Sequence, residues 1–109
     1  MAEQQIEENT EEIEKQEHLS KAYNDLLDLI SSSNDRDFLE SFFDSLITPG
    51  ERKAIAERWL LVKELKAGCT QREIARRYNM SLCKITRGSR ELQKKDSAFL
   101  KALSMVEKE

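Results

Sequence analysis

The chain has 109 residues, of which 39% are apolar and 36% are charged, and its formal net charge is −3. A small domain buries only about two-thirds of the surface that its unfolded chain exposes. The high charge fraction therefore limits the apolar surface that a monomer can bury. A core shared with a second chain would bury more of it. No apolar run approaches the roughly 18 residues of a membrane span, and the acidic N-terminus lacks the features of a signal peptide. We therefore expect a cytoplasmic protein with no membrane association.

The net charge hides a division between the two halves of the chain. Residues 1–50 carry 3 basic and 13 acidic side chains, whereas residues 51–109 carry 15 basic and 8 acidic ones. Nine of the basic side chains and only two acidic ones fall within residues 66–95. A basic half of this kind points to a polyanionic partner such as nucleic acid. The alternative is a pair of solvated faces of opposite sign.

Catalytic and metal-binding patterns are missing from the sequence. Cys69 and Cys83 form no closely spaced pair, and His18 is the only histidine, so a four-ligand zinc site is not expected. The three glycines form no phosphate-binding loop, and His18 lies in a polar segment without a nucleophile partner. We therefore expect neither an enzyme nor a metal site, and we expect both thiols to be reduced.

The predicted elements begin after an acidic segment, residues 1–12, which we expect to be a disordered tail because it holds little apolar surface. From Ile13 to Ile30, apolar side chains recur at three- and four-residue steps, which predicts a helix. A second helix is predicted over 35–47, where six large apolar side chains lie within ten residues. So wide an apolar face on a short helix must be covered, which again favours a second chain.

We expect residues 13–109 to form one helical domain. Capping signals mark where its later helices begin and end. Thr48 followed by Pro49 and Glu51 predicts the start of a helix, because the threonine hydroxyl and the glutamate can satisfy orphan N–H groups. Gly68 is well suited to end that helix.

A second capping box begins at Thr70 and opens a short predicted helix over 71–77. Asn79 predicts a turn, because asparagine tolerates the left-handed conformation, and Ser81 can cap a helix over about 82–92. A last helix of about ten residues buries Phe99, Leu100, Leu103 and Val106. The sequence thus predicts an all-α fold of about six helices.

Residues 70–92 follow the spacing of a DNA-binding helix-turn-helix. The small Ala75 lies where the two helices approach most closely. The positions with buried spacing are Ile74, Tyr78, Met80 and Ile85. In such a unit the N-terminus of the second helix enters the major groove. The side chains expected at DNA are Gln71, Arg72, Met80, Ser81, Leu82, Cys83, Lys84 and Thr86. Because most of these are short or apolar, water and DNA shape would contribute to specificity. The alternative is a basic helical interaction module that docks an acidic protein partner.

Three motifs carry a resemblance to a known family. Residues 47–52 read Ile-Thr-Pro-Gly-Glu-Arg, residues 71–74 read Gln-Arg-Glu-Ile, and residues 85–89 read Ile-Thr-Arg-Gly-Ser. In collinear order over about 46–93, the chain resembles the bacterial Trp repressor family. The resemblance implies an intertwined homodimer whose helix-turn-helix units bind operator DNA of tryptophan biosynthesis or uptake genes. It also implies L-tryptophan as the corepressor, which favours the DNA-competent arrangement by population shift.

The resemblance assigns the corepressor pocket to Ile47, Thr48, Arg58, Lys84, Arg87, Gly88 and Glu91. Arg58 and Arg87 match two arginines that sandwich the indole, since guanidinium planes stack on aromatic faces, and Arg87 can also meet the carboxylate. Ile47 and Thr48 match a segment that receives the amino group of the ligand from the other chain. Gly88 would leave room beside the ring.

Several positions depart from the family pattern. Lys84 stands in place of a threonine near the carboxylate, Glu91 in place of a serine near the amino group, and Ser45 in place of a leucine. A lysine can still pair with a carboxylate, and a glutamate with an ammonium. These departures leave open a regulator of the same fold that responds to a different small effector. On the DNA side, Ala75 replaces a backbone-contacting lysine, and Cys83 replaces a small residue.

Overall fold

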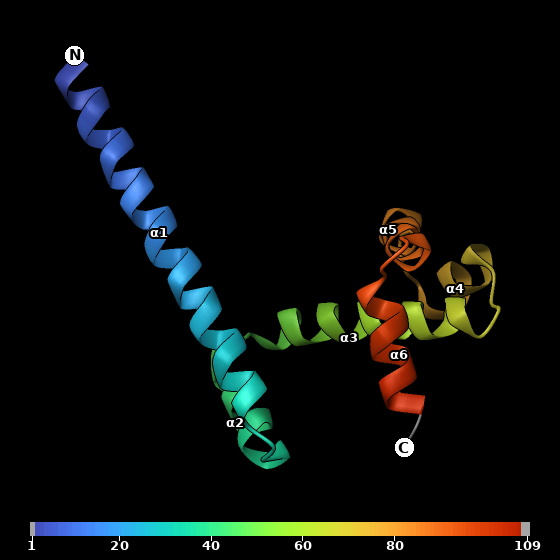
Figure 1. Ribbon diagram of the computed structural model, residues 1–109. Helices are drawn as coiled ribbons and strands as arrows, with labels where there is room; N and C mark the ends of the chain where they lie inside the picture. The colour runs from blue at the N-terminus through green and yellow to red at the C-terminus, as the bar shows by residue number, and fades with distance from the viewer. Residues whose placement is uncertain (1, 108–109) are drawn as a thin grey trace. The chain divides into compact units, whose positions relative to one another are not determined.

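The structure is a computed structural model that describes residues 2–107, and these residues form six helices and no strand (Figure 1). The predicted all-α class is therefore confirmed. The helices are α1 (Ala2–Ser32), α2 (Arg36–Leu46), α3 (Pro49–Lys66), α4 (Gln71–Tyr78), α5 (Leu82–Gln93) and α6 (Ala98–Glu107). The chain divides after Leu46 into two compact units, the first holding α1 and α2 and the second holding α3 to α6.

Helix α1 differs from the prediction at its start. Residues 1–12 were expected to be disordered, but the structure continues α1 back to Ala2, while residue 1 lies outside the described part. The segment 2–32 contains neither glycine nor proline, and its first turns are rich in glutamate and glutamine. These residues have good helix propensity, so the lack of apolar surface does not prevent a helix from extending through them.

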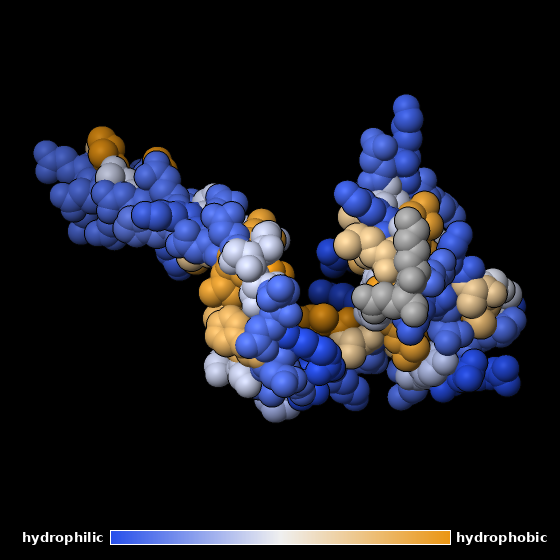
Figure 2. Space-filling view, turned by 60° about the horizontal axis from the view of Figure 1, so that its bottom comes forward, coloured by the Kyte–Doolittle hydropathy of each residue, from blue (hydrophilic) through white to orange (hydrophobic). Residues whose placement is uncertain are grey.

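The first unit leaves its apolar side chains exposed. Neither α1 nor α2 contains a buried residue. The exposed large apolar side chains of this unit are Ile6, Ile13, Leu19, Tyr23, Leu27, Ile30, Phe38 and Leu46. In the space-filling view, orange side chains accordingly reach the surface of this unit (Figure 2). Of the wide apolar face predicted for the second helix, Phe38 and Leu46 are exposed, and the other side chains are only half-buried within the single chain.

The second unit has a core of its own. Helix α3 packs against α4 and α5, and α5 packs against α6. The core consists of Leu61, Val62, Ile74, Met80, Ile85 and Leu103. Of the side chains that the last helix was predicted to bury, Leu103 belongs to this core and Phe99 packs against it, but Leu100 and Val106 are exposed in the single chain. At its edge the rings of Trp59 and Phe99 lie with centroids 6.5 Å apart. Each fully buried aliphatic side chain contributes about 1.5–3 kcal/mol, so this small core can hold four helices together.

Gly88 determines how closely α5 approaches α3. A Cβ atom built on Gly88 would collide with the δ-methyl group of Leu61 and would also meet Val62. The glycine is buried, so its bare backbone lies directly against α3. Any side chain at this position would therefore displace Leu61 or push α5 away from α3.

The predicted caps occur at all three helix starts. Thr48 caps α3 in a complete capping box with Glu51, whereas at Thr70 the structure gives only the bond from the Glu73 N–H to the threonine hydroxyl, and Ser81 caps α5. Asn79 adopts the left-handed conformation with φ 53° and ψ 51°, and Gly68 follows α3 with φ 101°. The hydrogen bond from the Thr48 backbone N–H to the Glu51 carboxylate lowers the pKa of Glu51. Among the described residues, no helix is long and apolar enough to cross a membrane.

Candidate functional site

The predicted DNA-binding unit is a pair of short helices, α4 and α5, joined by a tight turn. The hydroxyl of Thr70 accepts a hydrogen bond from the Glu73 N–H at 3.2 Å, and that of Ser81 accepts one from the Lys84 N–H at 3.2 Å. Ile74 and Ile85 are fully buried beneath the pair. Ala75 is half-buried at the margin of this core, as its predicted place at the crossing requires.

Most side chains predicted to meet DNA lie on the outside of this pair. Arg72, Ser81, Leu82 and Cys83 are exposed, and Gln71, Lys84 and Thr86 are half-buried. The Thr86 hydroxyl donates a hydrogen bond to the Gln71 side-chain oxygen at 3.1 Å, which ties the start of α4 to the second turn of α5. Met80 is the exception, because only 7% of it is exposed. It belongs to the core, so its predicted place at the DNA is corrected to a supporting role under the turn.

A cavity of about 600 Å³ lies between α3 and α5, with α6 at one side. Its lining residues are Arg58, Leu61, Val62, Cys83, Lys84, Arg87, Gly88, Glu91 and Phe99. Five of the seven residues predicted to bind a small ligand are therefore together in one cavity. The other two, Ile47 and Thr48, lie at the start of α3 and are not among its lining residues.

The cavity combines an apolar floor with a charged rim. Leu61 and Val62 are buried and form the floor, while Arg58 and Arg87 are exposed on α3 and α5. The Lys84 ammonium lies 3.8 Å from the Glu57 carboxylate. Such a pocket fits a small flat molecule with an apolar body and a charged end, because the walls match the body and the rim matches the charge.

Glu91 completes the charged rim on the side of α5. Its Oε1 accepts a hydrogen bond from Lys94 Nζ at 2.9 Å. The carboxylate therefore already has a cationic neighbour, and it is the acidic group among the residues that line the cavity. No cluster of three or more His, Cys, Asp or Glu side chains suited to a metal ion occurs within residues 2–107.

A cluster around Glu64 was not predicted from the sequence. The Glu64 carboxylate accepts hydrogen bonds from the Cys69 thiol at 3.1 Å and from the Tyr78 hydroxyl at 3.0 Å. The Arg77 guanidinium lies 3.9 Å from the same carboxylate and stacks over the Tyr78 ring, 5.1 Å from its centroid. These contacts join the end of α3 to the end of α4, so they fix the orientation of the shorter helix.

The pKa values of this cluster follow from its hydrogen bonds. Donation from Cys69 and then from Tyr78 lowers the pKa of Glu64. The hydrogen bond to Glu64, with burial, raises the pKa of Cys69. Burial, with the same kind of bond, raises the pKa of Tyr78. The raised pKa favours the protonated thiol of Cys69 over the thiolate, which is the nucleophilic form.

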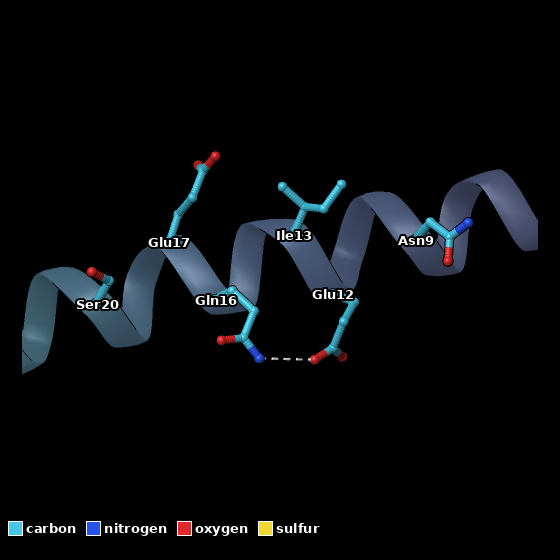
Figure 3. Close-up of a pocket in the computed structure, with 6 residues that line it drawn as sticks. All are labelled: Asn9, Glu12, Ile13, Gln16, Glu17 and Ser20. Atoms are coloured by element: carbon cyan, nitrogen blue, oxygen red, sulfur yellow. Dashed lines mark hydrogen bonds between the residues drawn. The ribbon is translucent and has the colours of Figure 1, made fainter.

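A second concave region, on α1, does not have the character of a binding site. All the residues that line it, Asn9, Glu12, Ile13, Gln16, Glu17 and Ser20, belong to this one helix (Figure 3). Their side chains point to different sides of the helix, and Gln16 Nε2 donates to Glu12 Oε1 at 3.2 Å. A groove with walls from a single helix cannot enclose a ligand, so the cavity between α3 and α5 is the stronger candidate.

Comparison with known proteins shows which family this chain belongs to. The sequence profile described as Trp repressor protein matches residues 21–107. A Trp operon repressor homolog of Chlamydia caviae is 40% identical over 85 residues, which cover 77% of this chain and 84% of that protein. A Trp operon repressor homolog of Vibrio parahaemolyticus is 35% identical over 82 residues, which cover 74% and 80%.

These matches define a class of transcriptional regulators rather than of enzymes. The chain belongs to the Trp repressor family. The resemblance stated from three short motifs is therefore confirmed, and the matched range extends it to α6 and to the second half of α1.

Proposed function

We propose that this protein is a tryptophan-dependent transcriptional repressor of the cytoplasm. In this proposal a homodimer binds operator DNA of tryptophan biosynthesis or uptake genes when L-tryptophan occupies the cavity between α3 and α5. The observation that carries it is the position of that cavity. It adjoins the first two turns of α5, so an occupant would touch the same helix that faces DNA.

The cavity residues divide the recognition of tryptophan between them. Arg58 on α3 and Arg87 on α5 flank the cavity and can stack on the two faces of an indole ring. Lys84 and Arg87 supply positive charge for the carboxylate, and Glu91 supplies an acceptor for the ammonium. Ile47 and Thr48 do not line the cavity of their own chain, and we assign them to the pocket of the second protomer.

The DNA surface is the exposed edge of α4 and α5. Arg72 and the N-terminal half of α5 supply the contacts to bases and phosphates, and the Gln71–Thr86 hydrogen bond keeps the two helices in register. The excess of basic side chains within residues 66–95 supports phosphate binding at this surface.

The homodimer covers the apolar surface of the first unit. From Ile13 onward, the apolar stripe of α1 and the face of α2 carry seven exposed large apolar side chains in the single chain. Contiguous exposed apolar surface of this kind is rare on monomers and typical of permanent subunit interfaces. In an intertwined homodimer, a second copy of the chain covers this apolar surface.

The test is a duplex selection with and without L-tryptophan. The full chain is incubated with a pool of random-sequence DNA duplexes, and the bound duplexes are recovered and sequenced. We expect a palindromic sequence to be enriched only in the presence of L-tryptophan, and titration of that sequence to give much tighter binding with the ligand. Equal binding with and without L-tryptophan would overturn the corepressor role but not DNA binding. Binding without sequence preference would instead favour the basic interaction module.

A second effector is favoured by one observation. The cavity is lined by Lys84 and Glu91 in addition to the two arginines, and Glu57 lies 3.8 Å from Lys84. This polar rim also suits a different indole or amino-acid effector on the same fold. Calorimetric titration with indole derivatives and amino acids separates the two possibilities, since the true effector gives the lowest Kd and the sharpest operator binding.

A further inference from the structure

The ion pair between Glu57 and Lys84 crosses the gap between α3 and α5 at the rim of the cavity. Lys84 lines the cavity, and Glu57 directly precedes the lining residue Arg58 on α3. Only 30% of the Lys84 side chain and 24% of the Glu57 side chain are exposed. The other described ion pairs are more exposed on at least one side, at 63–86%. Water therefore screens the Glu57–Lys84 attraction less than it screens the others.

The position of Lys84 in α5 creates a need for a nearby anion. Its backbone N–H donates to the Ser81 hydroxyl, which places Lys84 in the first turn of the helix. The N-terminal end of a helix carries partial positive charge, so a cation in the first turn is unfavourable there. In the empty cavity the Glu57 carboxylate supplies the compensating negative charge.

The geometry of the pair leaves Lys84 open to a better acceptor. Charge-assisted N–H···O bonds are about 2.7–2.9 Å long. The separation of 3.8 Å between Lys84 Nζ and Glu57 Oε1 exceeds hydrogen-bonding distance. A carboxylate that enters the cavity can therefore accept a hydrogen bond from Lys84 that Glu57 does not accept.

We propose that Glu57 is a specificity-determining residue that competes with the ligand's carboxylate for Lys84. The pair neutralises Lys84 while the cavity is empty, and an entering carboxylate takes the ammonium over from Glu57. Glu57 thereby weakens the binding of every carboxylate ligand and leaves the binding of uncharged ligands unchanged. The inference rests on the proposed function only in that a small aromatic ligand enters this cavity.

The experiment measures three ligands by calorimetry on the full chain and on the Glu57→Gln variant. L-tryptophan carries a carboxylate and an amine, indole-3-propionate carries only a carboxylate, and indole carries neither. We expect the substitution to lower the Kd of both carboxylates about two- to fivefold, which is the scale of one partly screened ion pair, and to leave indole unchanged. Glu107→Gln makes the same change of net charge on α6, outside the cavity, and should change none of the three values.

A double-mutant cycle with Lys84→Gln tests whether Glu57 acts through Lys84. In the Lys84→Gln background we expect Glu57→Gln to tighten neither carboxylate. Tightening that persists there, or equal tightening of indole, would overturn the inference and leave the proposed function intact. If indole-3-propionate responds as expected but L-tryptophan does not bind, the role of Glu57 is supported and the corepressor role of L-tryptophan is rejected. If none of the three ligands binds, both the role of Glu57 and the corepressor role of L-tryptophan are rejected.

Discussion

The two units of this chain bury their apolar residues to very different extents. In the first unit, neither α1 nor α2 has a buried residue, and Tyr23 is 62% exposed. In the second unit, Leu61, Val62, Ile74 and Ile85 are essentially inaccessible to water. Both units are rich in large apolar side chains, so the contrast does not reflect composition. The difference in burial depends on whether the same chain supplies a surface that covers the apolar side chains.

This contrast separates the parts of the molecule that depend on a second chain from those that do not. The second unit brings the cavity and the predicted DNA surface together with its own core and its own capped helices. The first unit has apolar faces that only another surface can cover. Changes to the first unit should therefore act through assembly, and changes to the second should act through local packing, the ligand and DNA.

The largest effect is expected from Leu27→Asp, which places a charge in the apolar stripe of α1. On a lone chain this exposed substitution would change the free energy of unfolding by no more than about 0.5 kcal/mol. In a dimer core it buries an unpaired charge and should cost about 3 kcal/mol or more. Light scattering and thermal unfolding measure the mass and the stability, and we expect a shift to monomer.

Ile6→Asp is the matched control for this prediction. Ile6 is exposed on the same helix but lies within residues 1–12, before the expected helical domain. We expect it to remain dimeric with nearly unchanged stability. A monomeric parent protein, or equal effects of the two substitutions, would contradict the division between the units.

The next effect belongs to the second unit and concerns Gly88→Ala. The added methyl group would collide with Leu61, so α5 must shift away from α3 or Leu61 must leave its place. Overpacking of this kind costs about 1–3 kcal/mol, and we expect urea unfolding to detect it without any loss of the dimer.

Gly50 provides the control, because a Cβ atom there meets only the Thr48 hydroxyl oxygen, at 3.9 Å. Gly50→Ala should therefore stabilise the protein slightly, by about 0.4–1 kcal/mol. Equal destabilisation by both changes would refute the close-approach role of Gly88.

The features that the sequence predicted well are local. The caps at Thr48, Thr70 and Ser81, and the left-handed Asn79, depend on residues within one helical turn, so spacing alone identifies them. The periodicity of apolar residues likewise places the helices. The family resemblance added the cavity residues, because their roles had been assigned in proteins with the same order of motifs.

The features that the sequence missed depend on tertiary packing. The Glu57–Lys84 pair joins residues on different helices, as does the Tyr78–Glu64 hydrogen bond. No spacing rule relates such residues before the crossing of the helices is known. The composition of residues 1–12 suggested disorder, but helix propensity carries α1 to Ala2 in the structure. Met80 was predicted both at a buried position and among the DNA-facing residues, and the structure agrees with the buried position.

A smaller effect is expected at the DNA surface from Arg72→Ala. Arg72 is exposed in the first turn of α4, so its loss should leave the dimer and the ligand affinity unchanged. Loss of one phosphate contact should weaken operator binding about three- to tenfold and reduce the salt slope of log K by about one. Fluorescence anisotropy over a series of salt concentrations measures both quantities.

The control for Arg72→Ala is an arginine of the first unit, which we do not expect to contact DNA. Arg36 is an exposed arginine on α2, in the first unit, where it pairs with Glu40 at 3.3 Å. Arg36→Ala removes the same charge, and we expect operator affinity and its salt slope to stay unchanged. If Arg36→Ala weakened DNA binding as much as Arg72→Ala, DNA binding would not be confined to the second unit.

The smallest effect is the pH dependence that the Glu64 cluster gives to the second unit. Hydrogen bonds from Cys69 and Tyr78 lower the pKa of Glu64 in the folded chain. The stabilisation from this carboxylate is therefore present above its ordinary pKa and is lost as the pH falls through the lowered value. Tyr78 behaves in the opposite sense, because its pKa is raised. Its contribution is present below the ordinary pKa of tyrosine and is lost as the pH rises through the raised value.

Glu64→Gln separates this cluster from the many other carboxylates of the chain. The amide keeps an acceptor for Tyr78 but does not titrate, so stability should fall less steeply in acid than in the parent protein. At alkaline pH the loss due to Tyr78 should also shrink, since ionised Tyr78 no longer faces a carboxylate. Urea unfolding over a pH series, with Glu12→Gln in the first unit as the control, measures the difference. Parallel pH profiles for the parent and Glu64→Gln would mean that the contacts of Glu64 do not hold α4 to α3 in solution.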